Sequence, residues 1–161
     1  MGTKQRRERE KLERRKNILG TARKLFWQKG FQKTTMPEIA EAVELAPGTL
    51  YLYFQSKESI YLELLLEGYD MLIMRLRGKN NPNASPKERT KALVREFFKF
   101  AVNNPEYFDI IFFVLQKEFG STRDSGFEIS QIERLEAKEK ECIRLASEAV
   151  SSGETAPKNE N

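Results

Sequence analysis

The chain has 161 residues, of which 39% are hydrophobic and 32% are charged. This length suits one domain, or a small domain that shares a hydrophobic core with a larger one. No apolar run approaches the roughly 20 residues that a membrane-spanning helix needs, so we expect no membrane protein.

The sequence contains no histidine and a single cysteine, Cys142. Without histidine the chain lacks the commonest general base and the commonest metal ligand, so we expect no enzyme, no metal site and no cofactor. A lone cysteine cannot form an internal disulfide, and this favours a reducing cytoplasmic location.

Charge is distributed unevenly along the chain. Residues 1–33 contain 12 Lys and Arg against 3 Glu, whereas residues 34–161 contain 16 against 21 Asp and Glu. A basic end and a mildly acidic body indicate that the N-terminus faces a polyanion, either nucleic acid or an anionic membrane surface.

The pattern of residues 17–29 predicts the first helix. Gly30 is expected to end it in the left-handed conformation, and Phe31 is expected to close the turn by an apolar contact. The basic arm before it, residues 4–16, either extends this helix or frays. The apolar face is formed by Ile18, Ala22, Leu25 and Phe26.

Two short helices follow. Thr35 and Glu38 have the spacing of a capping box, and Pro37 falls in the first turn of a helix of about two turns. After a break at residues 44–46, Pro47 and Gly48 open a second short helix. The inward face of the first of these helices is formed by Ile39, Ala40 and Val43.

In the second short helix, Leu50 and Phe54 are four residues apart and are expected to face the core, whereas Tyr51 is rotated about 100° away. Thr49 and Tyr53 share another exposed side. Two short helices with a four-residue turn, packed on a basic first helix, predict a helix-turn-helix. Tyrosine suits a DNA contact because it offers a rigid ring and a hydroxyl that reaches a phosphate.

The remaining pattern is helical and we find no convincing strand, so we predict an all-α fold. In chain order it predicts Ser56 as an N-cap, a helix over 57–77 and a linker over 78–84. A helix capped by Ser85 and Glu88 is then expected to about residue 103, followed by a helix capped by Asn104-Pro105. A loop over 120–126, a helix over 127–151 and a polar tail over 154–161 are expected after them.

Aromatic side chains are unusually dense in the second half of the chain. Packing of a helical core and the lining of a pocket for an apolar ligand both explain this density, and the alternatives stay open. The candidate ligand-binding residues are Phe97, Phe98, Phe100, Tyr107, Phe108 and Phe112.

Residues 20–65 resemble the DNA-binding domain of the TetR family of bacterial transcriptional regulators. The resemblance lies in A-x-x-L-F at 22–26, K-G-F at 29–31, T-T at 34–35, I-A at 39–40 and G-T-L-Y-x-Y-F-x-S-K-E at 48–58. It implies a three-helix DNA-binding domain with its basic arm over residues 1–56. A long fourth helix then leads into a helical ligand-binding and dimerisation domain over residues 57–161.

The resemblance implies a homodimer that binds a palindromic DNA operator, usually as a repressor, and is released by a small-molecule inducer. In the family two further helices normally follow a segment like residues 146–161, so we expect this chain to lack the last dimer helices. The implied DNA contacts are Thr34, Thr35, Pro47, Gly48, Thr49, Tyr51, Tyr53 and Lys57.

A second hypothesis is a helical protein–protein or anionic-surface module that uses the basic arm. Membrane insertion requires an apolar stripe, and residues 4–16 contain only Leu12 as a large apolar side chain.

Overall fold

The computed structural model describes residues 3–79, 81, 83–114 and 129–151, and the expected loop over 120–126 and tail over 154–161 lie outside these ranges. Every regular element in this part of the chain is helical, as the sequence predicts. The elements are α1 (Thr3–Lys29), α2 (Met36–Ala42), α3 (Pro47–Tyr51), α4 (Lys57–Arg77), α5 (Pro86–Asn103), α6 (Pro105–Asp109), η1 (Ile110–Val114) and α8 (Ile129–Val150).

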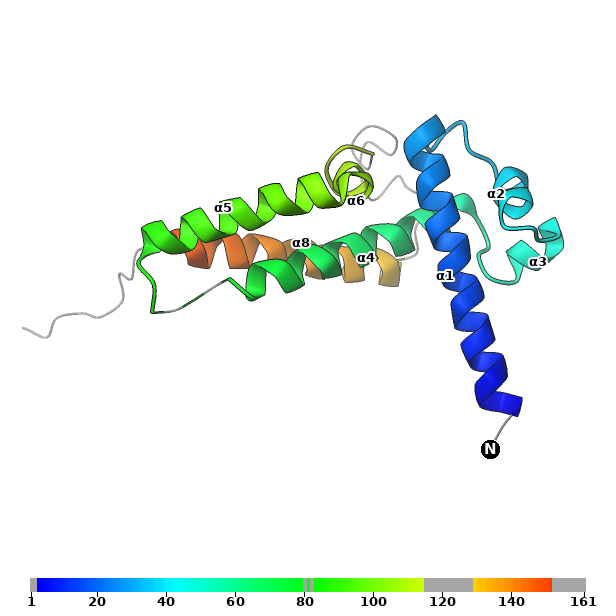
Figure 1. Cartoon of the computed structure of the whole chain (residues 1–161), viewed down its shortest axis with the longest axis horizontal. Coiled ribbons are helices and arrows are strands. Elements are labelled where there is room, and N and C mark those ends of the chain that lie inside the picture. The colour runs from blue at the N-terminus through cyan, green and yellow to red at the C-terminus, as the bar shows by residue number, and fades with distance from the viewer. Residues whose placement is uncertain (1–2, 80, 82, 115–128, 152–161) are drawn as a thin grey trace, which may run out of the picture.

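Figure 1 shows two parts of the molecule. Helices α4, α5 and α8 run alongside one another, and α1 crosses one end of this group with α2 and α3 on its far side. One continuous cluster of buried apolar side chains joins the two parts, from Ile18 in α1 to Leu145 in α8. No helix in the described ranges is long and apolar enough to cross a bilayer.

The basic arm is part of α1, which resolves the open question of whether it extends the helix. Gly30 ends α1 with φ 85°, in the left-handed region where glycine has no Cβ penalty. Phe31 is buried beyond it, and its ring lies 5.2 Å from that of Phe26. This contact confirms the predicted end of the helix.

Side-chain caps fix the starts of α2, α4 and α5 where the sequence predicted them. Thr35 with Glu38 and Ser85 with Glu88 form complete capping boxes, and Ser56 caps α4 together with Ser59. Each cap satisfies backbone N–H groups that have no partner within the helix, so these boundaries depend on local sequence.

The expectation for Asn104 is wrong in one respect. Its side chain does not cap α6; its amide donates instead to the carbonyl of Phe100, at the end of α5. Helix α6 is also short and passes directly into the π-helical turn η1. Tyr61 of α4 donates a buried 2.7 Å hydrogen bond to the carbonyl of Ile110, which ties η1 to the core.

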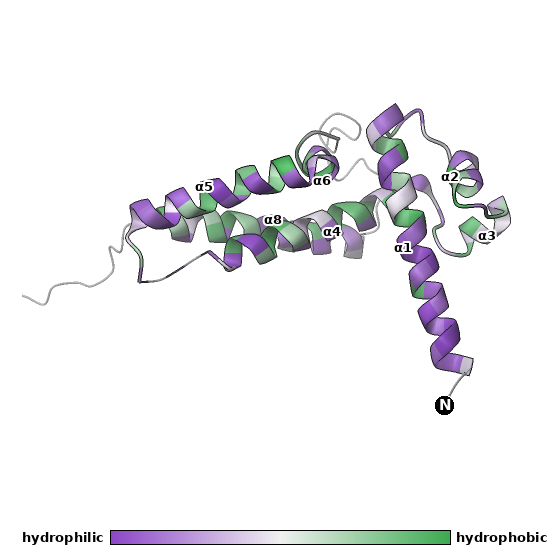
Figure 2. Cartoon of the chain, viewed as in Figure 1, coloured by the Kyte–Doolittle hydropathy of each residue, from purple (hydrophilic) through white to green (hydrophobic). Residues whose placement is uncertain are grey.

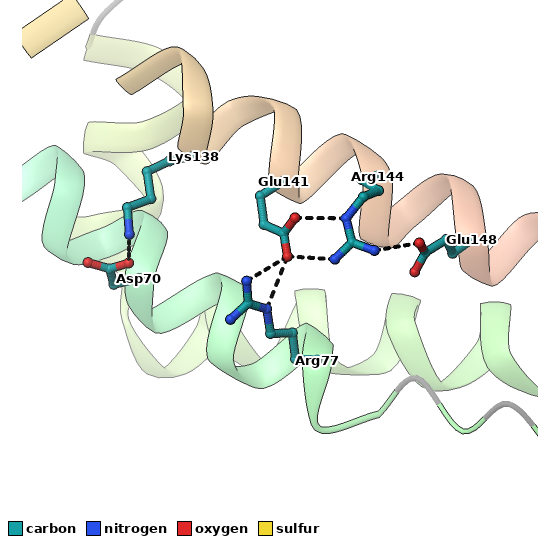
Figure 3. Close-up of polar contacts among 6 residues, drawn as sticks. All are labelled: Asp70, Arg77, Lys138, Glu141, Arg144 and Glu148. Carbon is teal, nitrogen blue, oxygen red and sulfur yellow. Dashed lines mark hydrogen bonds and ion pairs between the residues drawn. The ribbon is translucent and has the colours of Figure 1, made fainter. Parts of the chain in front are cut away.

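Ion pairs join α4 to α8 on the surface of the helical body (Figure 3). Arg77 donates to Glu141 at 2.7 and 3.0 Å, and Arg144 donates to both oxygens of the same carboxylate. Asp70 of α4 pairs with Lys138 of α8 one turn away from this group.

Candidate nucleic-acid interface

The second short helix, α3, is held to the molecule by its apolar side. Leu50 is fully buried and Phe54 nearly so, as the spacing predicts. Between α2 and α3 the chain turns at Glu44, whose φ of 56° is unusual for a residue with a side chain. This turn presents the opposite side of α3 outward.

The outward side of α3 carries the predicted contact residues. Tyr51 is 48% exposed, Pro47 and Gly48 are exposed, and Thr49 is half-buried. Nothing lies within 4 Å of where a Cβ of Gly48 would stand, so a ligand backbone can approach closely there. Tyr53 is less accessible than expected, because its ring packs partly against the core.

A groove of about 330 Å³ runs between the start of α2, the end of α3 and the start of α4. It brings together Thr35, Tyr51 and Lys57, three of the residues predicted to contact DNA. It also contains Gln32 and Gln55, which the sequence analysis missed. The sequence could have indicated both residues, because they come shortly before the predicted caps of α2 and α4, and the start of a helix favours an anion such as a phosphate.

Thr34 also lines this groove, but its side chain has a structural role. It is 0% exposed, and its hydroxyl donates to the carbonyl of Gly30 at 2.9 Å. The hydroxyl therefore stabilises the turn after α1, and the contact of Thr34 with a phosphate stays a prediction. Thr35 is exposed, but its hydroxyl is engaged with Glu38 in the capping box.

Lys57 has a structural task that the sequence did not reveal. Its ammonium donates to the carbonyls of Phe31 (2.8 Å) and Gln32 (3.4 Å) and lies 4.3 Å from the centre of the Phe31 ring. These contacts hold the α1–α2 loop against the start of α4. Lys57 also lines the groove, so its contact with a phosphate stays a prediction.

The candidate ligand-binding aromatics do not form one pocket. Phe97, Phe108 and Phe112 are a half-buried trio with ring centres 4.8 to 5.6 Å apart. Phe100 is fully buried in the core. Phe98 is 64% exposed on α5, where it lines a separate surface pocket with Arg95 and Val102, so it does not join the trio.

Tyr107 takes part in a polar junction between the two parts of the molecule. Arg23 of α1 donates to the Tyr107 hydroxyl and to Glu106, and the hydroxyl donates to Glu67 of α4, each at 2.6 Å. Burial and the bond to Glu67 raise the pKa of Tyr107 to about 12. A pocket of about 440 Å³ beside this junction is also lined by Met71 and by residues 103–105.

Cys142 is half-buried, and burial together with Glu141 and Glu139 raises the pKa of its thiol to about 11. The thiolate is the reactive form of cysteine, so this environment agrees with an inert side chain. In the described part of the chain, acidic and cysteine side chains form no group that could hold a metal ion.

A short, core-anchored helix with an outward tyrosine, set on a basic first helix, defines a helix-turn-helix DNA-binding domain. Comparison with known proteins agrees, since residues 18–64 match the family described as "Bacterial regulatory proteins, tetR family". This part of the chain is therefore similar to the DNA-binding domains of TetR-family transcriptional regulators.

Two of the curated relatives illustrate the similarity of sequence. It is 39% identical over 75 residues to the regulator YuxN of Bacillus subtilis, covering 47% of this chain and 26% of YuxN. It is 32% identical over 93 residues to the repressor KstR of Rhodococcus jostii, covering 58% and 43%. The chain thus spans less than half the length of these curated relatives.

Solved structures extend the likeness of fold to most of the chain. A TetR-family protein from Rhodococcus RHA1 superposes with a TM-score of 0.75 at 18% identity, over 87% of this chain and 69% of the other. The ketosteroid regulator KstR2 of Mycobacterium tuberculosis gives 0.67 at 26% identity, over 87% and 67%.

Proposed function

We propose that this protein binds a palindromic DNA operator as a homodimer, represses transcription there, and is released by a small hydrophobic ligand. In this proposal residues 1–56 are the DNA-binding domain and residues 57–161 are the ligand-binding and dimerisation domain. Helix-turn-helix dimers read two half-sites, so a palindrome follows from two-fold symmetry.

The observation that carries the DNA-binding part is the two-sided character of α3. Leu50 and Phe54 fix one side in the core, and Tyr51 is held outward beside the open space at Gly48. A large aromatic side chain held outward on a short rigid helix gains little for the fold, whereas it offers a major groove both an apolar surface and a hydroxyl.

The ligand part of the proposal rests on the trio Phe97, Phe108 and Phe112. These rings lie on α5, α6 and η1, where an apolar molecule could insert between helices. Among the relatives, KstR2 is named as a ketosteroid regulator and a protein of Bacillus halodurans as a fatty acid degradation regulator. Both names agree with a largely apolar ligand.

Fluorescence anisotropy tests the DNA-binding part, with DNA from upstream of the protein's own gene and an excess of scrambled duplex as competitor. We expect binding that survives the competitor, with at least two chains per duplex. Tyr51→Ala should weaken binding about tenfold, within the range of one good base or backbone contact. Met74→Ala is the control, because Met74 is exposed near the C-terminal end of α4, and this end of the helix lies away from α3 (Figure 1).

If the scrambled duplex abolishes binding, the proposed sequence-specific regulator is wrong for this DNA. If Tyr51→Ala binds as tightly as the Met74→Ala control, the outward side of α3 is not the reading surface. Addition of a ketosteroid or a long-chain fatty acid to the complex then tests release from DNA, which should appear as a fall in anisotropy. Phe108→Ala should reduce this fall, because Phe108 belongs to the trio proposed to bind the ligand.

A further inference from the structure

The first half of α1 is a helix whose length the core does not require. Residues 3–16 extend beyond the rest of the molecule (Figure 1) and are hydrophilic almost throughout (Figure 2). They carry eight Lys and Arg against three Glu. An arm of this composition buries little apolar surface, so packing alone does not account for a rigid helix here.

One side of this arm continues the surface of the helix-turn-helix. Arg7, Lys11 and Arg14 line a shallow groove of about 210 Å³ together with Glu10 and Tyr53. The Glu10 carboxylate is paired with Arg6 at 3.1 Å, which offsets its charge. The three cations, spaced i, i+4 and i+7, form a ridge that runs about 10 Å along the helix axis.

Arg15 fixes the arm relative to α3. Its guanidinium donates to the carbonyl of Tyr53 at 2.9 Å, lies 4.1 Å from the centre of the Phe54 ring, and pairs with Glu63 of α4 at 3.1 Å. These three contacts come from the end of α3 and the start of α4. Arg15 is therefore a positioning residue that holds the ridge at a set angle to the recognition helix.

We propose that Arg7, Lys11 and Arg14 form a second DNA-contacting element, which binds phosphates of the duplex outside the stretch that α3 occupies. The inference rests on the proposed function. A duplex presents one phosphate charge per about 1.7 Å of axis, so a ridge of about 10 Å faces several of them. Flexible lysine and arginine side chains suit such contacts, which carry no base specificity.

An anionic bilayer is the competing partner for a basic helix. Surface helices that enter a bilayer present a continuous apolar face. Leu12 is the sole large apolar side chain among residues 3–16, and it lies outside the groove of the ridge. The sequence of the arm thus favours phosphates of nucleic acid.

The test compares two double variants that remove the same charge. Arg7→Gln/Lys11→Gln removes ridge cations, and Arg9→Gln/Lys16→Gln removes exposed cations that do not line the groove and that lie about half a turn round α1 from Arg7. Glutamine keeps a helix propensity similar to that of Lys and Arg, so the arm should stay helical by circular dichroism.

Anisotropy titrations over a salt series give the slope of log affinity against log salt concentration. The double variant Arg7→Gln/Lys11→Gln should flatten this slope by about 1.8, because each of its two lost phosphate contacts accounts for about 0.9. The change should be the same with the upstream and the scrambled duplex, because phosphate contacts do not depend on sequence. The control double should leave the slope close to that of the unaltered protein. Shortening the duplex to the segment under α3 should remove the difference between the two doubles.

Glu10→Gln provides a test that loss of folding cannot imitate. It removes a negative charge from the groove and releases Arg6, so binding to duplex at low salt should tighten, by about threefold. Equal slopes for the two doubles, or no gain with Glu10→Gln, would overturn the inference while leaving the α3 assignment in place. If Tyr51→Ala made no difference to DNA binding in the unaltered protein or in any of these variants, the proposed function itself would be overturned. If the ridge cations were needed for sedimentation with anionic vesicles but not for binding to DNA, the ridge would be assigned to membranes.

Discussion

The N-terminal arm and the helical body use the same charged side chains in different ways. In the arm, Arg7, Lys11 and Arg14 line an open groove beside Tyr53. In the body, carboxylates and cations from α4 and α8 pair across the helix–helix boundary, as Glu141 does with Arg77. The cations of the arm thus line open space, whereas those of the body pair with carboxylates of a neighbouring helix.

Helices α3 and α4 also differ in how firmly the core holds them. Helix α4 buries side chains around most of its circumference, but α3 depends on Leu50 alone within its five residues and on Phe54 just beyond it. The part of the molecule around α3 is therefore the one in which a single apolar truncation has the largest local effect.

The largest expected effect on the free energy of unfolding comes from Leu50 in α3, and Leu52 just beyond α3 is its matched control. Leu50→Ala should lower the free energy of unfolding by about 3 kcal/mol, because it leaves a cavity at a fully buried position. Leu52→Ala, at a position that is 80% exposed, should change it by less than about 0.5 kcal/mol. Urea denaturation measures both, and similar losses would show that α3 is not anchored by its Leu50 side.

A smaller effect is expected where the arm helix meets the body. Tyr107→Phe removes the hydroxyl that links Arg23 to Glu67 and should cost about 1 to 2 kcal/mol, since two charged groups lose a hydrogen-bond partner. Tyr51→Phe is the matched control on an exposed tyrosine and should be near neutral. If Tyr107→Phe were equally neutral in urea denaturation, the junction would not contribute to joining the two regions.

The smallest effect concerns the ion pairs in Figure 3. Hydrogen bonds from Arg144 and Arg77 lower the pKa of Glu141 to about 2, below its ordinary value of 4.5. A lowered carboxylate pKa stabilises the folded state above the unfolded pKa, and this stabilisation is lost as pH falls through the folded pKa. Unfolding of the protein and of Glu141→Gln should thus differ at pH 6 and converge as pH falls from about 4.5 towards 2.

Glu136→Gln is the control for this pH series. Glu136 lies on the same helix and pairs only loosely with Lys140, at 3.6 Å within α8. Its substitution should leave the pH dependence close to that of the unaltered protein. A difference between the protein and Glu141→Gln that persisted unchanged to pH 2 would contradict the assigned role of the ion pairs.

Local signals in the sequence were sufficient for most helix boundaries. The predicted limits of α4 and α5 agree with the structure, because Ser56 and Ser85 cap the starts and the linker at 78–84 separates the helices. The inward positions of Leu50 and Phe54 followed from helical spacing. Capping and periodicity act over a few residues, so they can be read without knowledge of the fold.

Contacts between distant residues decided the rest. Lys57 of α4 donates to the carbonyl of Phe31, which is 26 residues away from it in the chain. Tyr107 lies between Arg23 and Glu67, which are 84 and 40 residues away from it in the chain. Neither arrangement has a sequence pattern, since a contact across such a separation depends on how the helices pack.

The sequence by itself determined the helical class, the caps, the core-facing side of α3 and the basic character of the N-terminus, because each depends on spacing or composition. The tertiary structure decided which exposed residues share a surface. It placed Gln32 and Gln55 beside Tyr51, moved Phe98 to the outside, and set the arm against α3 through Arg15. The physical reason is that a binding surface is formed by neighbours in space, and those neighbours come from separate helices.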